Sequence, residues 1–299
     1  MNNKAFDVVV VIVNWERPPD TIQCIRSVLE SQLVKLHIVV VDNGSRDDSI
    51  KQIRSAFPEI SLIPLKRNLG FAGGFNVGIE RALQMPVPYI FLLNNDTVLE
   101  ATTIKSLIEA PWDVSVPKIL YFDQPQRVWA AGAYWRPFPP AVIMKGFQKP
   151  DGPAYNMPYP LDYATGCALM VKREVLEKIN AFDPEFENYM EDYDFTYRVR
   201  AAGFTMGYVP EAIMLHKVSQ TLGEESPLRW RFLGRNTVFF YRKENRFPIR
   251  ILAGYLAWFI MRELVKGKIS RIINFFKGVN EGFKILKQKE ASACGKHSL

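Results

Sequence analysis

Acidic side chains stand at two places in this sequence where they could bind a metal ion or a nucleotide. Asp96 closes the stretch FLLNNDT, in which an apolar run ends at Asn94, Asn95 and this carboxylate. Asp42 follows directly after the apolar run 38–41. One hard carboxylate, completed by the phosphates of a bound ligand, commonly holds Mg²⁺ or Mn²⁺. A carboxylate also accepts hydrogen bonds from a base or a ribose. The two positions therefore indicate a site for a phosphorylated ligand, with Asp96 as the metal ligand.

Ordinary structural roles are the alternative for both carboxylates. Asp42 could form an Asx turn or cap a helix, but Ser45 and Asp47 already offer caps for the segment that follows. Asp96 could cap a helix that begins near residue 102, although Thr97 and Thr102 are better placed for that role. We therefore favour ligand binding for both carboxylates.

A third acidic cluster could supply a proton acceptor. Glu191, Asp192 and Asp194 lie within four residues, between aromatic neighbours. Glu191 and Asp194 are three residues apart and would share a helix face, whereas Asp192 would point elsewhere. Like charges that crowd together raise each other's pKa, which suits a general base. An exposed acidic turn is the alternative interpretation.

The elements that carry these residues alternate between strand and helix. Continuous apolar runs predict buried parallel strands, and helical periodicity separates them. We expect strands at 8–13, 38–41, 61–65 and 89–93, with helices at 19–31, 45–57 and 73–85. Asn14, Asp42 and Asp96 then stand at carboxyl ends of strands, where open α/β sheets bind their ligands. A Ser45–Asp48 capping box is expected to open the second helix.

A glycine-rich segment follows the third predicted strand. Gly70, Gly73, Gly74 and Gly78 predict a loop that approaches a ligand closely, with Gly73 near the nucleotide. The segment is neither G-x-G-x-x-G nor a P-loop, which disfavours a dinucleotide oxidoreductase.

The second half of the chain is less regular at first and then becomes helical. Residues 110–160 predict loops and short strands that cover the site, 164–171 a buried strand, 187–203 a helix and 204–209 a strand. His216 follows another apolar run and could be a core histidine or a ligand. From residue 228 onward the pattern is helical.

The charge of the chain is unevenly distributed. Residues 1–225 have a net charge of −5, and residues 226–299 have +12. In 269–286 an apolar stripe lies beside lysines, which suits a helix in a membrane interface, although a core helix or a homodimer helix would show the same stripe. The acidic body and the lack of a recognisable module disfavour nucleic-acid binding.

Composition and cysteine content also indicate the cellular compartment of the protein. Hydrophobic residues make up 48% of the chain, which is typical of a globular protein with a sizeable core. The three cysteines lack metal or redox spacing, which favours a reducing compartment without disulfides. We find no secretory signal and expect a cytoplasmic protein, peripheral on the inner face of the cell membrane.

Taken in order, the motifs resemble a known family. The chain is similar to inverting family 2 glycosyltransferases with the GT-A fold, most of all to the rhamnosyltransferase-like branch. The resemblance covers roughly residues 6–245 and rests on these segments: VVIVNW, VVVDNGSRDDS, RNLGFAGGFNVG, LLNNDT, TGCALMVKRE, FDPEFENYMEDYDFTYRVRAAGF and VPEAIMLH. It implies a GT-A domain over 1–245, with a nucleotide-binding half to about residue 100 and an acceptor half from 101. Residues 246–299 would form a basic amphipathic tail.

The resemblance also implies the chemistry. The enzyme would move a sugar from dTDP-rhamnose or a UDP-hexose to a hydroxyl of a glycan or lipid-linked acceptor, in cell-surface polysaccharide synthesis. A divalent cation, Mg²⁺ or Mn²⁺, would be needed. A non-catalytic, membrane-associated scaffold is the alternative function.

Individual positions match the family's functional residues. Asp42 matches the contact with the nucleotide base, and Arg67 and Asn68 match the loop beside the nucleotide. Asp192 matches the general base of the E-D motif, in which Glu191 is the acidic partner.

The metal site departs from the usual pattern. Asp96 matches the last carboxylate of the D-x-D motif, and His216 matches the histidine that joins the metal site in some members. Here Asn94 and Asn95 precede Asp96, so the first carboxylate of the motif is an amide. Fewer charged ligands should weaken metal binding when no sugar nucleotide is present.

Overall fold

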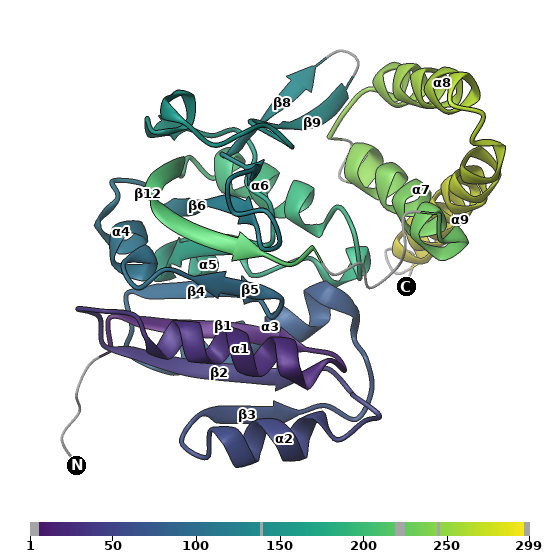
Figure 1. The fold of residues 1–299 in the computed structure, drawn as a ribbon. Coiled ribbons are helices and arrows are strands. Elements are labelled where there is room, and N and C mark those ends of the chain that lie inside the picture. Colours follow the sequence, from purple (N-terminus) through teal and green to yellow (C-terminus); the bar gives the residue numbers. More distant parts are fainter. Residues whose placement is uncertain (1–5, 138–139, 219–224, 244–245, 296–299) are drawn as a thin grey trace. The chain divides into compact units, whose positions relative to one another are not determined.

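The computed structural model describes residues 6–137, 140–218, 225–243 and 246–295 (Figure 1). Residues 138–139, within the predicted loop region, and the last four residues of the predicted tail lie outside this part. The chain forms two compact units. The first comprises Met1–Arg136, Val142–Glu187 and Glu191–Ser219, and the second comprises Pro137–Ala141, Asn188–Met190 and Gln220–Leu299. The division into domains at residue 245 stays a prediction.

The first unit is built on a mostly parallel sheet, as the sequence predicts. Its strand order is β10-β12-β6-β11-β4-β1-β2-β3. The parallel core consists of β1 (Val8–Asn14), β2 (Leu36–Asp42), β3 (Ser61–Pro64) and β4 (Tyr89–Asn94). On the other side of β4, β11 (Ala168–Lys172) runs antiparallel to β4 and β6, and β12 (Met206–His216) runs parallel to β6 (Val114–Tyr121).

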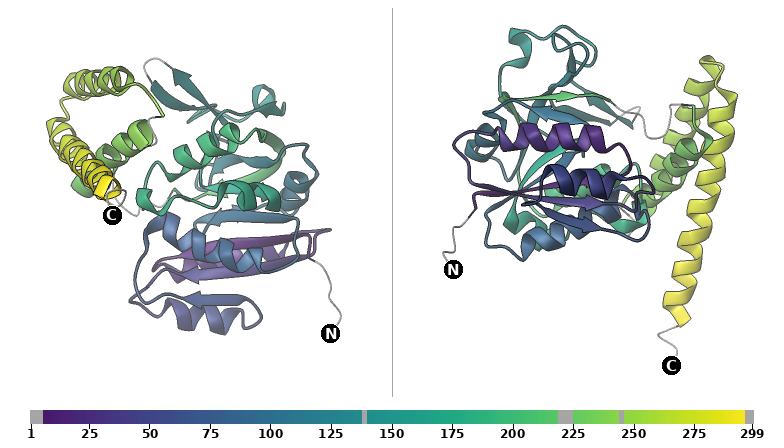
Figure 2. Two further views of the ribbon diagram at one scale, coloured as in Figure 1. Left: turned by 180° about the vertical axis from the view of Figure 1, so that it is seen from behind. Right: turned by 60° about the horizontal axis from the view of Figure 1, so that its bottom comes forward.

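Helices cover both faces of this sheet (Figures 1 and 2). Alternate residues of β1 point in opposite directions, and each set is completely buried in its own hydrophobic core. Val8, Val10 and Ile12 pack with α1 (Pro18–Leu29), α2 (Ser49–Ala56) and α4 (Thr103–Glu109). Val9 and Val11 pack with α3 (Gly70–Leu83), α5 (Arg173–Ile179) and α6 (Glu191–Ala201).

The segment 110–160 contains more regular structure than its sequence predicts. Its strand β6 is eight residues long and lies inside the main sheet. Pro117 and Lys118 interrupt the apolar pattern that would have revealed this strand. Lys118 is buried because its ammonium binds the Asp151 carboxylate at 3.2 Å and Asn156 Oδ1 at 2.6 Å. The remaining elements are β7 (Val128–Ala130), β8 (Ala133–Pro137), β9 (Pro140–Met144), a 3₁₀ turn (Pro153–Tyr155) and β10 (Tyr159–Pro160).

The glycine-rich segment is helical, as the predicted helix at 73–85 requires, and only the expectation of a loop at Gly70 is wrong. α3 begins at Gly70, so Gly73, Gly74 and Gly78 lie within it. A Cβ atom on Gly78 would lie 2.2 Å from Val11 Cγ1, and one on Gly74 would lie 2.9 Å from a methyl group of β1. These glycines therefore let the helix approach the sheet closely.

The described residues of the second unit form the helices α7 (Pro227–Arg242), α8 (Ile249–Val265) and α9 (Ile269–Gly295). α7 and α9 touch along their backbones. A Cβ on Gly234 would lie 1.9 Å from the Phe275 carbonyl oxygen, and a Cβ on Gly278 would lie 1.9 Å from the Arg231 carbonyl oxygen. Glycine is required at both positions because any side chain would force the helices apart.

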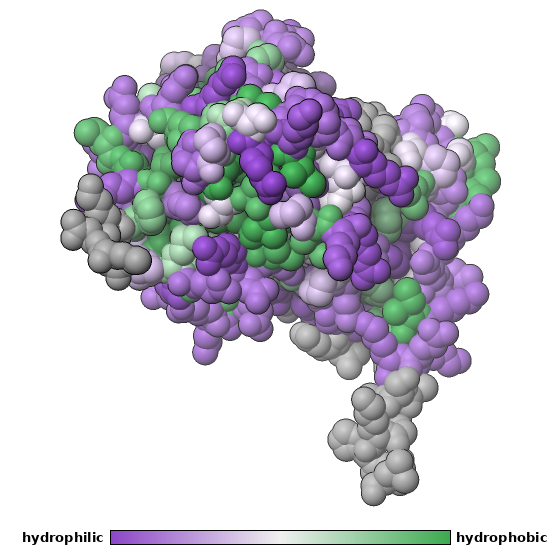
Figure 3. Space-filling model, turned by 90° about the horizontal axis from the view of Figure 1, so that it is seen from below, coloured by the Kyte–Doolittle hydropathy of each residue, from purple (hydrophilic) through white to green (hydrophobic). Residues whose placement is uncertain are grey.

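The apolar stripe predicted in the tail is divided between the interior and the surface. Val279 is buried with Phe275 and Trp230 in the core of the second unit, and Ile272, Phe276 and Leu286 pack against that core. Ile269, Ile273 and Phe283 stay exposed. Core packing therefore accounts for part of the stripe. No helix in the part of the chain described here is long and apolar enough to cross a membrane. The face drawn in Figure 3 is mostly hydrophilic, with smaller hydrophobic patches.

Candidate active site

A chain of hydrogen bonds joins the carboxyl ends of β4, β1 and β2. Asn95 Nδ2 donates to Thr21 Oγ1 at 2.9 Å, and this hydroxyl donates to Asn14 Oδ1 at 2.6 Å. Asn14 Nδ2 in turn donates to Asp42 Oδ2 at 2.7 Å. The structure therefore brings together three positions that the sequence placed at strand ends, with Thr21 of α1 as the link.

The Asp42 carboxylate accepts its hydrogen bonds from neighbouring residues of the chain. Besides Asn14, its carboxylate accepts hydrogen bonds from the backbone N–H of Ser45 at 3.0 Å and from the Ser45 hydroxyl at 2.7 Å. Both Asn14 and Asp42 are fully buried. The predicted capping box is wrong, because Ser45 binds Asp42 and α2 begins only at Ser49, whose N–H and hydroxyl donate to Asp47.

Hydrogen bonds from Asn43 fix the loop that carries Arg67 and Asn68. Asn43 Nδ2 donates to Asn68 Oδ1 at 3.1 Å, and its Oδ1 accepts from the Leu69 N–H at 2.9 Å. Gly44, at φ +74°, lies so close to Arg67 that a Cβ would be 2.4 Å from its carbonyl carbon. Arg67 and Asn68 are exposed at the edge of the sheet, where a ligand can reach them.

Asp96 and His216 meet although 120 positions separate them. After Asp96 the chain forms β5 (Thr97–Leu99), which pairs antiparallel with β12 and places Thr97 opposite His216. The Lys217 N–H donates to the Asp96 carbonyl at 2.9 Å. His216 Nε2 consequently lies 3.3 Å from Asp96 Oδ1, and both side chains are about nine-tenths buried.

Asp96 and His216 together could supply two of the ligands of a metal ion, but not a complete set. Burial disfavours a charged imidazole, but Cys167 and Asp96 outweigh it and raise the pKa of His216 to about 10. A cation between the two side chains would replace that proton. The residues fit Mg²⁺ or Mn²⁺ because a carboxylate oxygen and an imidazole nitrogen face each other, which leaves the other positions for substrate phosphates. No group of three or more His, Cys, Asp or Glu among the described residues could hold a metal ion.

Asp192 lies in the first turn of α6 and accepts three hydrogen bonds. Its Oδ2 accepts from the Tyr163 hydroxyl at 2.5 Å and from the Gly166 N–H at 3.2 Å, and its Oδ1 accepts from the Tyr193 N–H at 2.9 Å. The side chain is only half-buried, unlike its neighbours Glu191 and Asp194. Asp192 is therefore held in one orientation yet remains accessible to a substrate.

The local environment makes Asp192 a stronger base than an ordinary aspartate. Burial raises its pKa, while the hydrogen bonds from Tyr163, Gly166 and Tyr193 limit the increase. Burial and the nearby Asp192 charge raise the pKa of Glu191 well above its usual value. Glu191 Oε2 is buried without a hydrogen-bond partner. A protonated Glu191 beside an ionised Asp192 is the arrangement that these environments favour.

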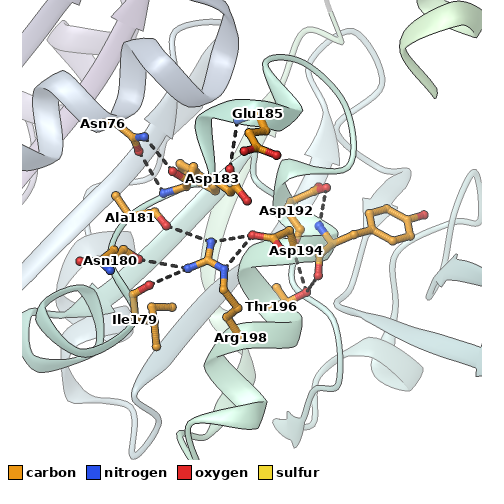
Figure 4. A network of polar contacts seen from close by, with 12 residues as sticks. Asn76, Ile179, Asn180, Ala181, Asp183, Glu185, Asp192, Asp194, Thr196 and Arg198 are labelled. Atoms are coloured by element: carbon orange, nitrogen blue, oxygen red, sulfur yellow. Dashed lines mark hydrogen bonds and ion pairs between the residues drawn. The ribbon is translucent and has the colours of Figure 1, made fainter. Parts of the chain in front are cut away.

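Asp194 belongs to a different network, shown in Figure 4. Arg198 Nε donates to Asp194 Oδ2 at 2.7 Å, and its guanidinium also donates to the carbonyls that end α5, including Ile179 at 2.8 Å and Ala181 at 2.9 Å. In Figure 4 Asp192 lies apart from Arg198, and no dashed line joins the two residues. The expectation that three acidic residues crowd one another is therefore wrong, because an arginine neutralises one of them.

A strained turn leads into α6. The helix begins at Glu191 rather than at the predicted residue 187, and Glu187, Tyr189 and Met190 have φ values of 52°, 68° and 65°. A left-handed conformation costs a residue with a side chain about 1–2 kcal/mol. Such strain persists only where surrounding contacts hold it, and it is concentrated at functional sites.

One short segment touches both candidate centres. Gly166 donates to Asp192, as described above, while the carbonyl of Cys167 accepts from the Asn94 N–H at 3.0 Å. Cys167 also contributes to the electrostatic environment of His216. Asp192 and His216 therefore interact with two consecutive residues, Gly166 and Cys167.

Sequence reasoning missed several residues of this site. Tyr163, Thr21 and Gly166 make contacts that only the folded chain creates, and no motif marks the first two. The T-G-C stretch before β11 belongs to a segment that matches the family, but nothing in it predicted that the Gly166 N–H donates to the Asp192 carboxylate.

Replacement of Tyr163 by Phe should move the pH dependence of the reaction. Burial and the Asp192 charge raise the pKa of Tyr163 well above its ordinary value, so its hydroxyl stays protonated and stabilises the Asp192 carboxylate. Without that donor the pKa of Asp192 rises further, and the acidic limb of the kcat/KM profile should shift to higher pH. Tyr208→Phe is the matched control, since it removes a buried hydroxyl that donates to the Tyr155 carbonyl at 2.8 Å. An unmoved limb in Tyr163→Phe would contradict the assigned contact.

Comparison with known proteins supports the predicted family. A sequence profile for glycosyl transferase family 2 matches residues 9–179. The low-salt glycan biosynthesis hexosyltransferase Agl10 of Haloferax volcanii is 26% identical over 292 residues, covering 92% of this chain and 91% of that protein. The N-acetylglucosaminyl-diphospho-decaprenol L-rhamnosyltransferase of Mycobacterium tuberculosis is 24% identical over 279 residues, covering 83% and 90%.

Solved structures agree on the fold. GalNAc-T7, crystallised with UDP, GalNAc and Mn²⁺, superposes with a TM-score of 0.60 at 15% identity, covering 80% of this chain and 50% of that one. The mannosyltransferase PcManGT of Pyrobaculum calidifontis, in complex with GDP-Man and Mn²⁺, has a TM-score of 0.55 at 14% identity, covering 97% and 81%.

Proposed function

Since this chain belongs to glycosyl transferase family 2 and has the GT-A fold, we propose that it transfers a hexosyl or rhamnosyl group with inversion. The donor is a nucleoside-diphosphate sugar, dTDP-rhamnose or a UDP-hexose. The acceptor is a hydroxyl group of a glycan or of a lipid-linked sugar. Relatives named as a hexosyltransferase of glycan biosynthesis and as an L-rhamnosyltransferase support this assignment.

One observation carries the mechanism. An accessible carboxylate with a raised pKa, Asp192, and the Asp96–His216 pair flank the same two residues, Gly166 and Cys167. Asp192 removes the proton from the acceptor hydroxyl, and the resulting oxygen attacks the anomeric carbon from the side opposite the leaving diphosphate. Glu191, when protonated, leaves Asp192 as the charged member of this pair.

The other side chains at this edge bind and orient the donor. Arg67 and Asn68 are exposed at the edge of the sheet, and Asn43 holds the loop that carries them. Asn14 and Asp42 form the buried network at the ends of β1 and β2. Asp96 and His216 would hold a divalent cation, which neutralises the charge that develops on the diphosphate. Asn94 and Asn95 complete the strand end that presents Asp96, and Gly73, in the first turn of α3, lies beside the loop of Arg67 and Asn68.

A panel of sugar nucleotides tests the donor. In the presence of Mg²⁺, dTDP-rhamnose or a UDP-hexose at about 100 times its Kd should stabilise the protein by roughly 2.7 kcal/mol. We expect a melting temperature several degrees higher with the cognate nucleotide, followed by transfer of a labelled sugar to an acceptor. NAD⁺ is the control ligand and should have no effect. If no sugar nucleotide shifted the melting temperature, the donor assignment would be wrong.

We also propose that the second unit attaches the enzyme to an anionic membrane surface, and that α8 makes the contact. Ala253, Ala257, Met261 and Leu264 repeat every three or four residues along α8, and all are exposed. Val265 extends the same surface and is 84% exposed. An apolar helix face with Lys266 and Arg250 at its two ends suits the boundary between headgroups and acyl chains. This attachment would keep the enzyme peripheral on the cytoplasmic face.

Serine replacements of Met261 and Leu264 test this contact. Because both side chains would insert into the acyl region, the double variant should bind vesicles with anionic lipids at least tenfold more weakly than the unaltered protein. Ile269→Ser with Ile273→Ser is the matched control, since these exposed residues of α9 lie outside the α8 face. If the full-length chain failed to bind anionic vesicles at low salt, membrane attachment itself would be excluded.

A further inference from the structure

An aromatic cluster lies beside Asp192 in the first unit. The Tyr193 ring contacts the Tyr163 ring, with centroids 4.9 Å apart and an interplanar angle of 63°. It also contacts the Trp135 ring, with centroids 5.9 Å apart and an angle of 85°. Tyr163 is the residue whose hydroxyl donates to Asp192. All four residues belong to the same unit, so the cluster and the proposed general base form one structural group.

The backbone places Trp135 and Tyr163 on one face. Ala133 of β8 forms an antiparallel bridge with Tyr163, and the Trp135 N–H donates to Asp162 Oδ1 at 2.7 Å. Residues two apart on a strand point in the same direction, so Trp135 shares the face of Ala133 and Tyr163. Tyr134, which lies between Ala133 and Trp135, points to the opposite face.

The cluster is accessible on the side of Trp135 and Tyr193. Both side chains are only partly buried, as is Asp192, whereas Tyr163 is buried. Among the described residues, the two hydrophobic cores that flank the sheet do not include Trp135 or Tyr193. Packing of these cores therefore does not account for the two rings. A ligand whose hydroxyl reaches Asp192 would lie beside the ring of the next residue, Tyr193.

The cluster also lies apart from the residues proposed for the nucleotide. Asp42 ends β2, and β1 and β4 separate that strand from β11. The segment that leads into β11 contains Gly166, whose N–H donates to Asp192. The aromatic rings therefore belong to the acceptor side of the proposed site.

Aromatic rings next to a carboxylate can recognise a sugar ring. One face of a pyranose presents C–H groups, whose hydrogens are attracted to the negative face of an aromatic ring. The hydroxyls at its edge need hydrogen-bond acceptors, and an ionised carboxylate accepts only. Aromatic walls with a few polar groups are typical of sites for small ligands.

We propose that Trp135 and Tyr193 form the acceptor subsite, where they hold the pyranose ring whose hydroxyl is deprotonated by Asp192. The inference rests on the proposed function, and it narrows the recognised part of the acceptor to a sugar ring rather than a lipid chain. A pyranose that stacks by one face keeps its hydroxyls at its rim, where one of them can reach Asp192. The stacking contact is made before and during the reaction, so it should act on acceptor binding more than on kcat.

Saturation-transfer NMR tests the subsite without any donor. The probes are methyl β-D-glucopyranoside, methyl α-L-rhamnopyranoside and methyl N-acetyl-β-D-glucosaminide, and 1-octanol represents a lipid chain. At least one glycoside should receive saturation from the unaltered protein, and the signal should fall at least about fivefold in Trp135→Ala because the stacking surface is lost. An absence of signal from every glycoside, an unchanged signal in Trp135→Ala, or a signal from 1-octanol alone would overturn the proposal.

Transfer kinetics with the glycoside that binds give a second test. Trp135→Ala and Trp135→Leu should raise the KM for the glycoside at least about tenfold, with kcat within about threefold and the dissociation constant of the donor within about twofold. Trp135→Phe retains an aromatic ring and should stay within about threefold of the unaltered KM. Tyr134→Ala is the matched control, because this side chain is 45% exposed on the same strand but points to the other face. It should leave the KM unchanged.

Thermal melting shows which variants fold. Unfolding of both Trp135→Ala and Trp135→Leu would mean that Trp135 serves stability, and an unchanged KM in a folded Trp135→Leu would mean that its ring does not bind the acceptor. The same rise in KM in Tyr134→Ala would show a general effect of the strand. Each of these results would overturn the subsite. If the glycosides bound but no sugar nucleotide supported transfer, the proposed function would fail and the subsite would stand.

Discussion

The variant Asp192→Asn should lose sugar transfer almost completely and still bind its donor. An amide cannot accept the proton of the acceptor hydroxyl, and general base catalysis contributes about 10²–10⁴-fold to a rate. The amide still fits the space between Tyr163 and Gly166, so the fold and the nucleotide site should be preserved. Transfer of labelled sugar measures the loss, and titration with the donor nucleotide measures binding.

Asp113→Asn is the matched control for this variant. Asp113 also accepts several hydrogen bonds and pairs with Lys172 at 2.9 Å, but it precedes β6, at the opposite end of that strand from Tyr121. It should therefore retain wild-type turnover. Near-normal turnover in Asp192→Asn would show that Asp192 is not the general base.

The pH dependence of the unaltered enzyme gives a further test. The ionised form of Asp192 is the form that can accept a proton, and burial raises its pKa. In the unaltered enzyme activity should therefore fall on acidification at a higher pH than for an ordinary aspartate.

Removal of divalent cations should abolish activity as well. With EDTA in excess we expect turnover to fall at least on the order of 10²-fold, because charge on the departing diphosphate would no longer be neutralised. Added Mg²⁺ or Mn²⁺ should restore the unaltered protein but not Asp96→Ala. His216→Ala keeps the carboxylate and should need a higher metal concentration for half-maximal activity.

The result that would contradict the metal site is equally clear. Full turnover in EDTA would mean that Asp96 and His216 form only an ion pair with each other and bind no metal. The 3.3 Å contact between them would allow this. Because the protein offers just one carboxylate here, metal affinity should depend strongly on the donor diphosphate. Calorimetry with Mn²⁺ in the presence and absence of the nucleoside diphosphate measures that dependence.

The sheet and its ligand-binding edge could be predicted because they depend on local pattern. Apolar runs ending at Asn14, Asp42 and Asp96 specify strands, and the alternation of strands and helices specifies a parallel sheet. The same reasoning failed where a polar residue sits inside an element. Lys118 concealed β6 because its charge is neutralised by residues that approach only after folding.

The site was predictable in its acidic residues and not in their partners. Types and order of residues indicated Asp96 as a metal ligand and the acidic cluster around Asp192 as a source of a general base, whereas the family resemblance indicated Asp192 itself and His216. These roles stay predictions. Which acidic residue is neutralised by an arginine, and which receives a tyrosine hydroxyl, depends on tertiary contacts such as those of Arg198 and Tyr163. The helix at 73–85 was predicted, but the sequence alone could not show that Gly74 and Gly78 serve close packing of this helix on β1 rather than approach to a ligand.

The contact between α7 and α9 through Gly234 and Gly278 has a practical consequence for truncation. A natural way to obtain a more soluble enzyme is to remove the chain after residue 245, but that cut also removes the helix against which α7 rests its backbone. Without α9, the α7 side chains Trp230 and Val238 would lose Phe275 and Val279, which help to bury them, so a shortened protein is expected to be unstable and to lose turnover together with any affinity for lipid. Loss of activity in such a protein could then be mistaken for a lipid requirement. Point variants on the exposed face of α8 test lipid binding without removing α9.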